Sequence, residues 1–352
     1  MASVGFIEGV AEATASFLKT FSGAWSDKSE KRKPFVCWGY FFAAVAKPLI
    51  ALATHWGWVL GARSLDRFGK GLRSAPRDAL LSESVDASQR GAAFGWHRFM
   101  DTLGAVIGPL LALLFLKWEP TGLRTVFFWA FIPGLVAVFI SLAIPETKPS
   151  PNLDRTERGK GLWKEMPLPF RRYLFTWLIF SLGNSSDVFL LLRAKEKGAS
   201  LTSVILFYCL YNWTYAFLSP FLGHLSDKIG RKKCLVYGLL VFALVYLGFS
   251  FASELWQFGL LFAVYGFYMA ATDGVGKAFA VDLVDPKHKA TALGFLGTVT
   301  GVAALVASSA AGLLWDQFGP AAPFLFGASG SLLALVLLGR TQFKALTDSS
   351  IV

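Results

Sequence analysis

The chain has 352 residues, of which 54% are hydrophobic and only 16% are charged, and it carries 33 Phe. So much phenylalanine with so little charge excludes an ordinary soluble domain. The net charge of +11 would suit nucleic acid, but the Lys and Arg residues gather at the ends of apolar stretches, where they set the topology of membrane proteins. The composition therefore predicts an all-α, polytopic protein of the cell (inner) membrane that binds no nucleic acid.

We expect eleven helical spans, since about 20 residues cross a bilayer. They are 3–24, 35–53, 56–81, 92–116, 123–144, 170–193, 201–225, 234–252, 255–281, 289–314 and 320–339. They form an N-terminal half (1–144) and a C-terminal half (170–340), with a polar, Pro-rich linker (145–169) and a tail (341–352). Lys and Arg concentrate in the linker, in the tail and after the first and seventh spans, so these segments are predicted to be cytoplasmic. The C-terminus would then lie inside and the N-terminus outside.

The third span carries a stripe of charges. As a helix, its charged residues fall within an arc of about 140°. They are Arg63, Asp66, Arg67, Lys70, Arg73, Arg77 and Asp78. Each charge facing lipid would cost roughly 2.5–3.5 kcal/mol, so the stripe must face water, protein or counter-ions.

Two interpretations of this stripe are open. Arg63, Arg67 and Lys70 are predicted to bind an anionic group of a substrate, because guanidinium groups match carboxylate or phosphate. The alternative is that all five cations are paired within the protein.

The sequence contains an internal repeat. The segment from Gly23 to Lys33 matches the segment 200 residues later, and Val85–Trp96 matches Val284–Phe295 at an offset of 199. Two matches at nearly one offset indicate a duplication, which is common in secondary transporters. The second copy has a span, 170–193, ahead of its repeated segment and the first copy has none, so we expect a first helix to be missing.

Carboxylates inside apolar spans are candidates for proton coupling. Asp187 and Asp273 lie within predicted spans, and Asp101 lies near the start of another. A carboxylate removed from water holds a proton more readily, so it can exchange protons during transport. For Asp273 a static salt bridge with Lys277, four residues later, is the alternative.

The two repeated loops resemble the cytoplasmic signature loop of the major facilitator superfamily, and the resemblance covers all eleven spans. The second copy, from Asp227 to Lys233, fits this signature in full, whereas the first has Glu30 where glycine is usual. The resemblance implies a twelve-helix transporter fold of two pseudo-symmetric halves, with this chain supplying helices two to twelve. The third, sixth and ninth spans would then line a central cavity.

The resemblance also implies a latch, in which loop aspartates face helix N-termini of the opposite half and basic residues pair with acids such as Asp78 or Glu83. The alternative is that these loops only fix topology. The latch residues would be Gly23, Asp27, Lys31, Arg32, Arg73, Arg77, Asp78, Gly223, Asp227, Gly230 and Arg231.

Two further resemblances are narrower. Gly104, Gly108 and Pro109 are similar to the antiporter signature of the superfamily, and they serve either close helix packing or antiport. Asp66–Leu80 and Leu182–Asp187 resemble a bacterial subgroup associated with siderophore export and iron handling.

Together these patterns predict a monomeric secondary transporter, not an enzyme, that needs no cofactor or metal. It would export a small anionic solute by alternating access, coupled to protons. Uptake or facilitated passage is the first alternative, and a non-transporting membrane sensor or assembly factor is the second.

Overall fold

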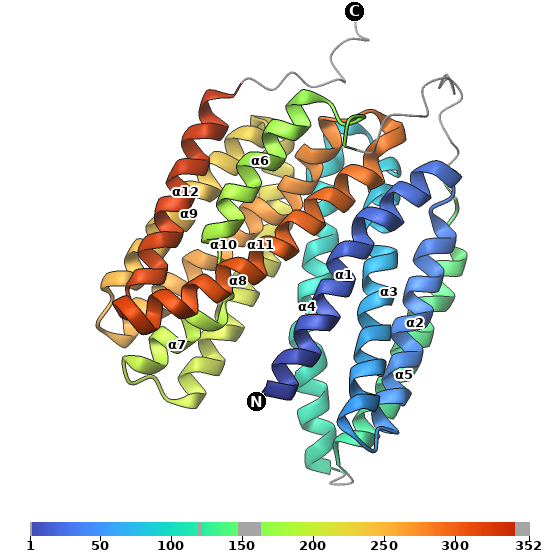
Figure 1. Cartoon of the computed structure of the whole chain (residues 1–352), viewed down its shortest axis with the longest axis horizontal. Coiled ribbons are helices and arrows are strands. Elements are labelled where there is room, and N and C mark those ends of the chain that lie inside the picture. Colours follow the sequence, from blue (N-terminus) through green and yellow to red (C-terminus); the bar gives the residue numbers. More distant parts are fainter. Residues whose placement is uncertain (1, 119–121, 147–162, 342–352) are drawn as a thin grey trace, which may run out of the picture. The chain divides into compact units, whose positions relative to one another are not determined.

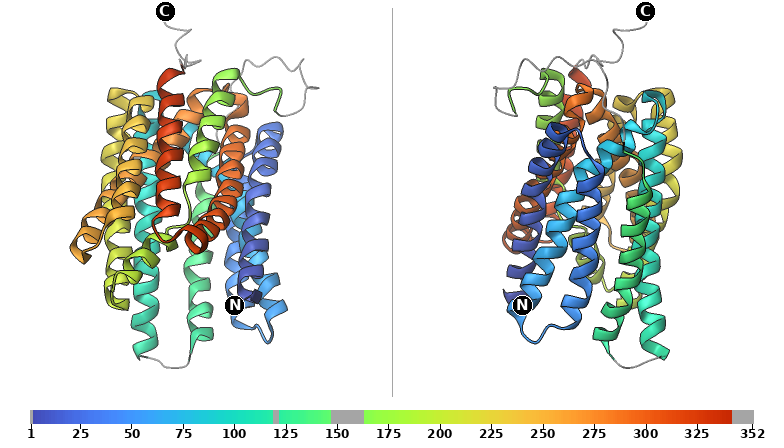
Figure 2. Two further views of the ribbon diagram at one scale, coloured as in Figure 1. Left: turned by 60° about the vertical axis from the view of Figure 1, so that its left-hand side comes forward. Right: turned by 90° about the vertical axis from the view of Figure 1, so that its right-hand side faces the viewer.

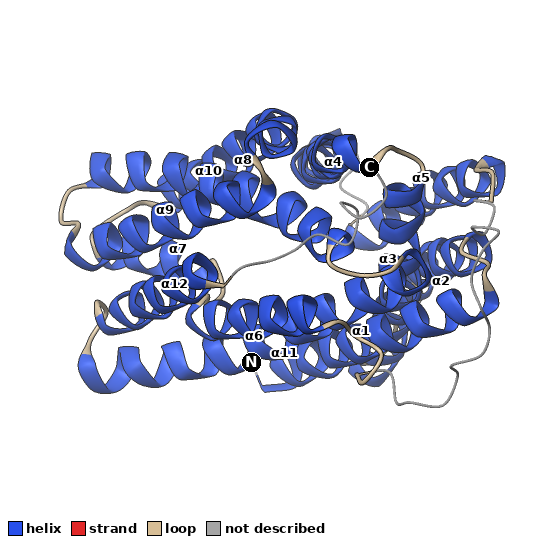
Figure 3. Cartoon of the chain, turned by 90° about the horizontal axis from the view of Figure 1, so that it is seen from above, coloured by secondary structure: helices blue, strands red, loops and turns tan. Residues whose placement is uncertain are grey.

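The computed structural model describes residues 2–118, 122–146 and 163–341, and every regular element in these ranges is helical (Figures 1 and 3). This confirms the predicted all-α class. The long helices are α1 (Ala2–Ser29), α2 (Lys33–Ala51), α3 (Trp56–Glu83), α4 (Arg90–Trp118), α5 (Leu123–Ala143), α6 (Leu168–Gly183), α7 (Val188–Glu196), α8 (Leu201–Ile229), α9 (Arg231–Phe251), α10 (Leu255–Asp282), α11 (Lys289–Phe318) and α12 (Ala322–Arg340). Short 3-10 turns, η1 (Ala87–Gln89) and η2 (Pro286–His288), precede α4 and α11.

The predicted spans correspond to these helices, with one difference. The span predicted at 170–193 is two helices, α6 and α7, separated by residues 184–187. Eight helical segments of the described part are long and apolar enough to cross a membrane. The third helix is not among them, as its charges predict. Most of the linker and all but the first residue of the tail lie outside the described residues.

The chain forms two compact units, which combine pieces of both sequence halves. One unit comprises Met1–Ser84, Gly108–Pro167 and Val284–Gly301, and the other comprises Val85–Ile107, Leu168–Leu283 and Val302–Val352. The boundaries at 107/108 and 301/302 fall inside α4 and α11, so each of these helices contributes to both units. We call them the first and the second unit.

In the first unit, α1 packs on α3, α3 on α2, and α2 on α5 (Figure 2). The contact between α2 and α3 is close, because a Cβ atom at Gly69 would lie 2.5 Å from the carbonyl oxygen of Gly39. This approach holds Arg73 against α2, where its Nη1 donates to the Gly39 carbonyl at 3.2 Å. The Arg73 guanidinium also lies over the Tyr40 ring, 4.5 Å from the centroid.

In the second unit, α10 packs on α8 and α9, and α12 packs on α9 and α6. Its core is aromatic, and large buried rings are worth more than their area alone because of edge-to-face contacts. The fully buried rings include Tyr173, Phe180, Phe242, Tyr246, Phe249, Phe258, Phe262, Tyr265 and Phe324. This core packs around the polar side chains of α8 and α10.

The two repeated loops turn through a left-handed residue at the same position. Glu30 has φ +55° and Gly230 has φ +93°, so the glycine expected at position 30 is replaced where the backbone would favour it. We expect Glu30→Gly to raise the free energy of unfolding by about 1 kcal/mol, since a left-handed conformation costs other residues that much. The matched change Gly230→Ala should lower it by at least as much. Unfolding midpoints in detergent measure both variants. If both substitutions changed the stability in the same direction, a left-handed backbone at these two positions would be contradicted.

Candidate functional site

Asp27, in the last turn of α1, binds the start of α11 within the first unit. Its carboxylate accepts hydrogen bonds from the backbone N–H of Thr291 at 2.7 Å and of Ala290 at 3.3 Å. The Thr291 hydroxyl donates to it at 2.6 Å. A carboxylate is stabilised there because the first N–H groups of a helix lack intrahelical acceptors.

Asp227, in the last turn of α8, makes the equivalent contact within the second unit. Its two carboxylate oxygens accept from the backbone N–H groups of Gly91 and Ala92, each at 2.9 Å. These residues begin α4, just as Ala290 and Thr291 begin α11. The contact that the family resemblance implied for Asp27 and Asp227 is therefore present in both copies of the repeat.

An arginine and a second acid complete each contact. Arg32 donates to Asp27 at 2.8 Å and, through two nitrogens, to Glu83 at 2.7 and 2.8 Å. Arg231 donates to Asp227 at 2.9 Å and pairs with Asp282. Glu83 and Asp282 are 199 residues apart, so the repeat preserves the whole group.

Charge and burial act against each other at Asp27 and Arg32. Burial raises the pKa of the Asp27 carboxyl, and Arg32 and the Thr291 hydrogen bonds act in the opposite direction. Burial alone would lower the pKa of Arg32, but Glu83 and Asp27 outweigh it and raise that pKa above its ordinary value. Arg32 therefore stays charged, and its partners depend on it for neutralisation.

Three other residues are also assigned to the latch. Lys31 is exposed, in contrast to its buried neighbour Arg32. Arg77 donates to the adjacent Asp78 at 3.0 Å. Arg73 contacts α2 through the Gly39 carbonyl.

The charged stripe on α3 is half-buried. Arg63, Arg67 and Lys70 are each intermediate in exposure. Asp66 accepts from Lys47 of α2 at 3.0 Å, a partner that the sequence did not indicate. The first unit thus concentrates cations on one helix.

Asp187 lies at the break between α6 and α7. Its carboxylate accepts from the Tyr265 hydroxyl at 2.6 Å and from the Tyr211 hydroxyl at 3.1 Å. Nearby, the Asn184 amide donates to the Tyr268 hydroxyl at 3.1 Å. The chain leaves helical geometry at a run of Asn, Ser and Asp, whose side chains compete for backbone hydrogen bonds.

Asp273 and Asp101 are joined by an arginine. Arg98 of α4 donates to Asp273 of α10 and to Asp101, both at 2.9 Å. The Tyr215 hydroxyl of α8 donates to Asp273 at 2.6 Å. Since the Asp101 side chain is 53% exposed, this group is accessible from one side. Arg98 and Tyr215 are therefore two partners of Asp273 that the sequence did not indicate.

Sequence reasoning missed the tyrosines and Arg98. Tyr208, Tyr211 and Tyr215 follow a three- and four-residue spacing that places them on one face of α8, which was an available signal. No spacing or motif in the sequence marks Arg98 as a site residue.

The close helix packing predicted at Gly104 and Gly108 is wrong. A Cβ atom at either position would meet no atom within 4 Å in the described structure, and both residues are exposed. The close approach of α4 occurs instead in its first turns, at Gly91 and Gly95. Pro109 lies in α4, but its side chain is outside the described ones.

Comparison with known proteins gives consistent results. Residues 1–208 and 188–349 match the family model of the Major Facilitator Superfamily. An uncharacterized MFS-type transporter of Methanocaldococcus jannaschii is 37% identical over 342 residues, which cover 96% of this chain and 85% of that protein.

Of two further similarities, one covers only part of the chain and the other is a similarity of fold. A class H tetracycline resistance protein of Pasteurella multocida is 35% identical over 128 residues, covering 36% of this chain and 32% of that protein. The crystal structure of the human organic anion transporter MFSD10 (TETRAN) shares the fold, with a TM-score of 0.76 and 18% identity, over 95% of this chain and 83% of that one.

Proposed function

Because the chain belongs to the Major Facilitator Superfamily, we propose that it exports a small anionic solute by alternating access, coupled to protons. The observation that best supports this proposal is the half-buried row of Arg63, Arg67 and Lys70 on a helix of a membrane protein. Cations are expensive in a bilayer, and they persist where they bind substrate or line a pathway.

The anionic charge of the solute follows from the guanidinium groups. Two arginines and a lysine on one face offer several donors to a carboxylate or phosphate. The fold shared with an organic anion transporter agrees with this assignment. The resemblance to siderophore exporters suggests an iron-chelating carboxylate as the solute. Such a compound is also an organic anion.

Proton coupling is assigned to Asp187, with Asp273 and Asp101 as a second group. Asp187 has two tyrosine donors, which hold its carboxylate in place whether or not it carries a proton. Export is proposed as the direction of transport. The latch role is assigned to the Asp27 and Asp227 contacts, on what we take to be the cytoplasmic side.

The function is tested in proteoliposomes that contain the pH dye pyranine and carry an imposed pH gradient. A panel of mono-, di- and tricarboxylates and organophosphates is added in turn, with neutral sugars and amines as controls. We expect at least one anion to drive proton movement. Proton movement with neutral or cationic solutes only would contradict the anionic assignment, and none at all would favour a sensor or assembly factor.

Arg67→Gln should reduce transport of that anion by about 10- to 100-fold, the effect of losing one charge-assisted hydrogen bond of roughly 1.5–3 kcal/mol. The solute concentration dependence of flux measures it. Arg171→Gln, a cation at the start of α6 and outside the stripe, is the control and should leave transport unchanged. Unchanged transport in Arg67→Gln would remove this residue from the site.

A further inference from the structure

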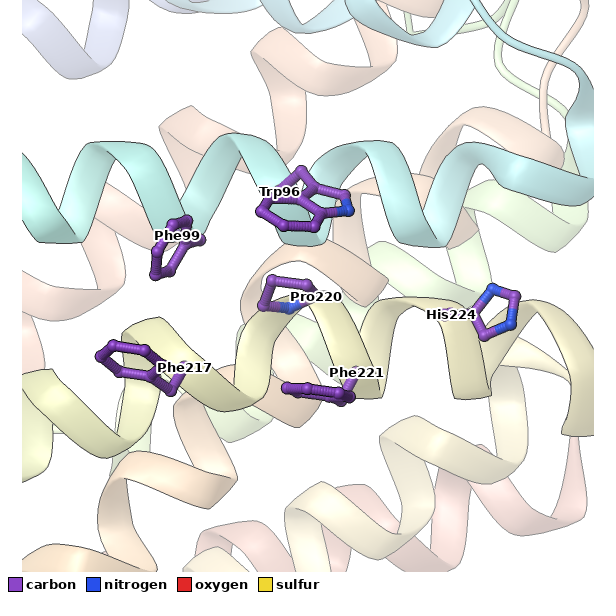
Figure 4. A pocket seen from close by; sticks show the side chains of 6 residues that line it. All are labelled: Trp96, Phe99, Phe217, Pro220, Phe221 and His224. Carbon is purple, nitrogen blue, oxygen red and sulfur yellow. The ribbon is translucent and has the colours of Figure 1, made fainter.

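A groove runs between α4 and α8 in the second unit (Figure 4). Its volume is about 390 Å³, within the range of small-ligand sites, about 300–1,000 Å³. Five of the six lining side chains are apolar and the sixth is an imidazole. They are Trp96, Phe99, Phe217, Pro220, Phe221 and His224.

The groove exists because α4 and α8 cross with their backbones in contact. A Cβ atom at Gly95 would lie 2.3 Å from the Ser219 carbonyl oxygen. Nothing larger than hydrogen fits at the crossing, so the neighbouring aromatic rings stand on either side of it. Trp96 is 56% exposed and Phe221 71% exposed, which leaves their ring faces open to the surroundings of the spans.

The equivalent crossing in the first unit differs at two of these positions. There α1 and α11 also touch, since a Cβ atom at Gly294 would lie 2.5 Å from the Lys19 carbonyl oxygen. By the repeat offsets, Thr20 corresponds to Pro220 and Thr298 to Phe99. The two threonine hydroxyls are hydrogen-bonded at 2.8 Å. Other lining positions are aromatic in both copies, because Phe17, Phe21 and Phe295 correspond to Phe217, Phe221 and Trp96. Phe99 and Pro220 are therefore the apolar lining residues that are replaced by hydroxyl-bearing ones in the first unit.

The groove has a basic end. His224 and Lys228 are four residues apart, so they lie on the same face of α8 at the end of its span. Trp213 and Phe217 continue this face toward the middle of the span, with ring centroids 4.5 Å apart. The face thus changes from aromatic to cationic as the helix leaves the apolar segment.

We propose that the groove binds one acyl chain of an anionic phospholipid, whose phosphate contacts His224 and Lys228. The spans are surrounded by lipid, and an apolar groove open to lipid is filled by a hydrocarbon chain. A cation at the membrane surface attracts an anionic headgroup, and an ammonium group donates readily to phosphate. This lipid site is separate from the charged stripe on α3 and does not depend on the identity of the transported solute.

The test uses the full chain, purified in detergent and incubated with phosphatidylglycerol that carries a diazirine in its acyl chain. After illumination, labelled peptides are mapped by mass spectrometry. We expect saturation near one lipid per chain, with label on the α4 and α8 peptides that line the groove. Trp96→Ala with Phe221→Ala should weaken labelling more than about ten-fold, because contact with several methylene groups is lost.

The matched control is Phe251→Ala with Trp256→Ala, two rings that are 76% and 69% exposed outside the groove. It should leave the labelling of the groove peptides unchanged. Equal labelling in the groove variant and this control, with both eluting as folded protein, would overturn the proposal.

Headgroup recognition is tested separately with Lys228→Gln, which keeps every wall of the groove. We expect phosphatidylglycerol to bind about five-fold more weakly, the effect of one cation near an anionic headgroup. Phosphatidylcholine and a fatty acid, each with the same diazirine chain, should label the native groove less than phosphatidylglycerol. Equal labelling by either probe, or no effect of Lys228→Gln, would overturn the assignment of an anionic phospholipid.

Discussion

Gly91→Ala should lower the free energy of unfolding by several kcal/mol, although alanine normally stabilises a helix by about 1 kcal/mol relative to glycine. The new Cβ atom would lie 2.4 Å from both the Gly223 carbonyl oxygen and the Ser226 hydroxyl, and 2.7 Å from an Asp227 carboxylate oxygen. Overpacking alone typically costs about 1–3 kcal/mol. Displacing Asp227 from the start of α4 adds the loss of its charged hydrogen bonds, about 1.5–3 kcal/mol.

Gly104→Ala on the same helix is the control for this prediction. A Cβ atom there meets nothing within 4 Å, so the substitution should be neutral or slightly stabilising. Thermal unfolding midpoints in detergent measure both variants. The repeat offers a contrary case, because the residue equivalent to Gly91 is Ala290. If the protein tolerated alanine at position 91 as it does at 290, glycine would not be required there for steric reasons. The contact of α4 with α8 would then pack like that of α11 with α1.

Asp187→Asn should reduce proton-coupled flux by about 100-fold or more, the scale of losing a positioned proton-transfer group. Asparagine has nearly the same shape and can still accept hydrogen bonds from Tyr211 and Tyr265, but it cannot bind and release a proton. Internal pH in pyranine-loaded proteoliposomes measures the effect, with the anion identified in the panel as the solute.

Two controls separate coupling from general damage. Asp316→Asn, a carboxylate near the end of α11, should leave the flux unchanged. Exchange of labelled for unlabelled anion without a pH gradient should persist in Asp187→Asn, because it requires no net proton movement. Normal gradient-driven flux in this variant would exclude Asp187 from the coupling mechanism.

The fold could be predicted from the sequence because two independent signals agreed. Apolar length identified most spans, and the repeat identified α3, whose charges hide it from a hydropathy measure. The Asp27 and Asp227 contacts followed from the signature loops, since a short motif with a fixed geometry transfers between relatives.

The interruption between α6 and α7 could not be predicted with the same method. Apolar residues continue on both sides of it, so the hydrophobic pattern predicts one span. Within that span, the pattern predicts that Asn184 to Asp187 are polar side chains on a continuous helix. Contacts such as Arg98 with Asp273 join residues 175 positions apart and leave no local pattern. The tyrosine donors were missed because tyrosines in an apolar span resemble ordinary packing residues.

The placement of the unit boundaries inside α4 and α11 has a consequence for splitting the gene. A cut in the linker at 145–169 would leave the N-terminal fragment without residues 284–301 of its unit, and the C-terminal fragment without residues 85–107 of the other. Each fragment alone would expose surfaces that the missing piece covers, and it would be expected to aggregate or be degraded. Co-expressed, the two fragments supply each other's missing piece, so complementation in trans should recover activity that neither has on its own.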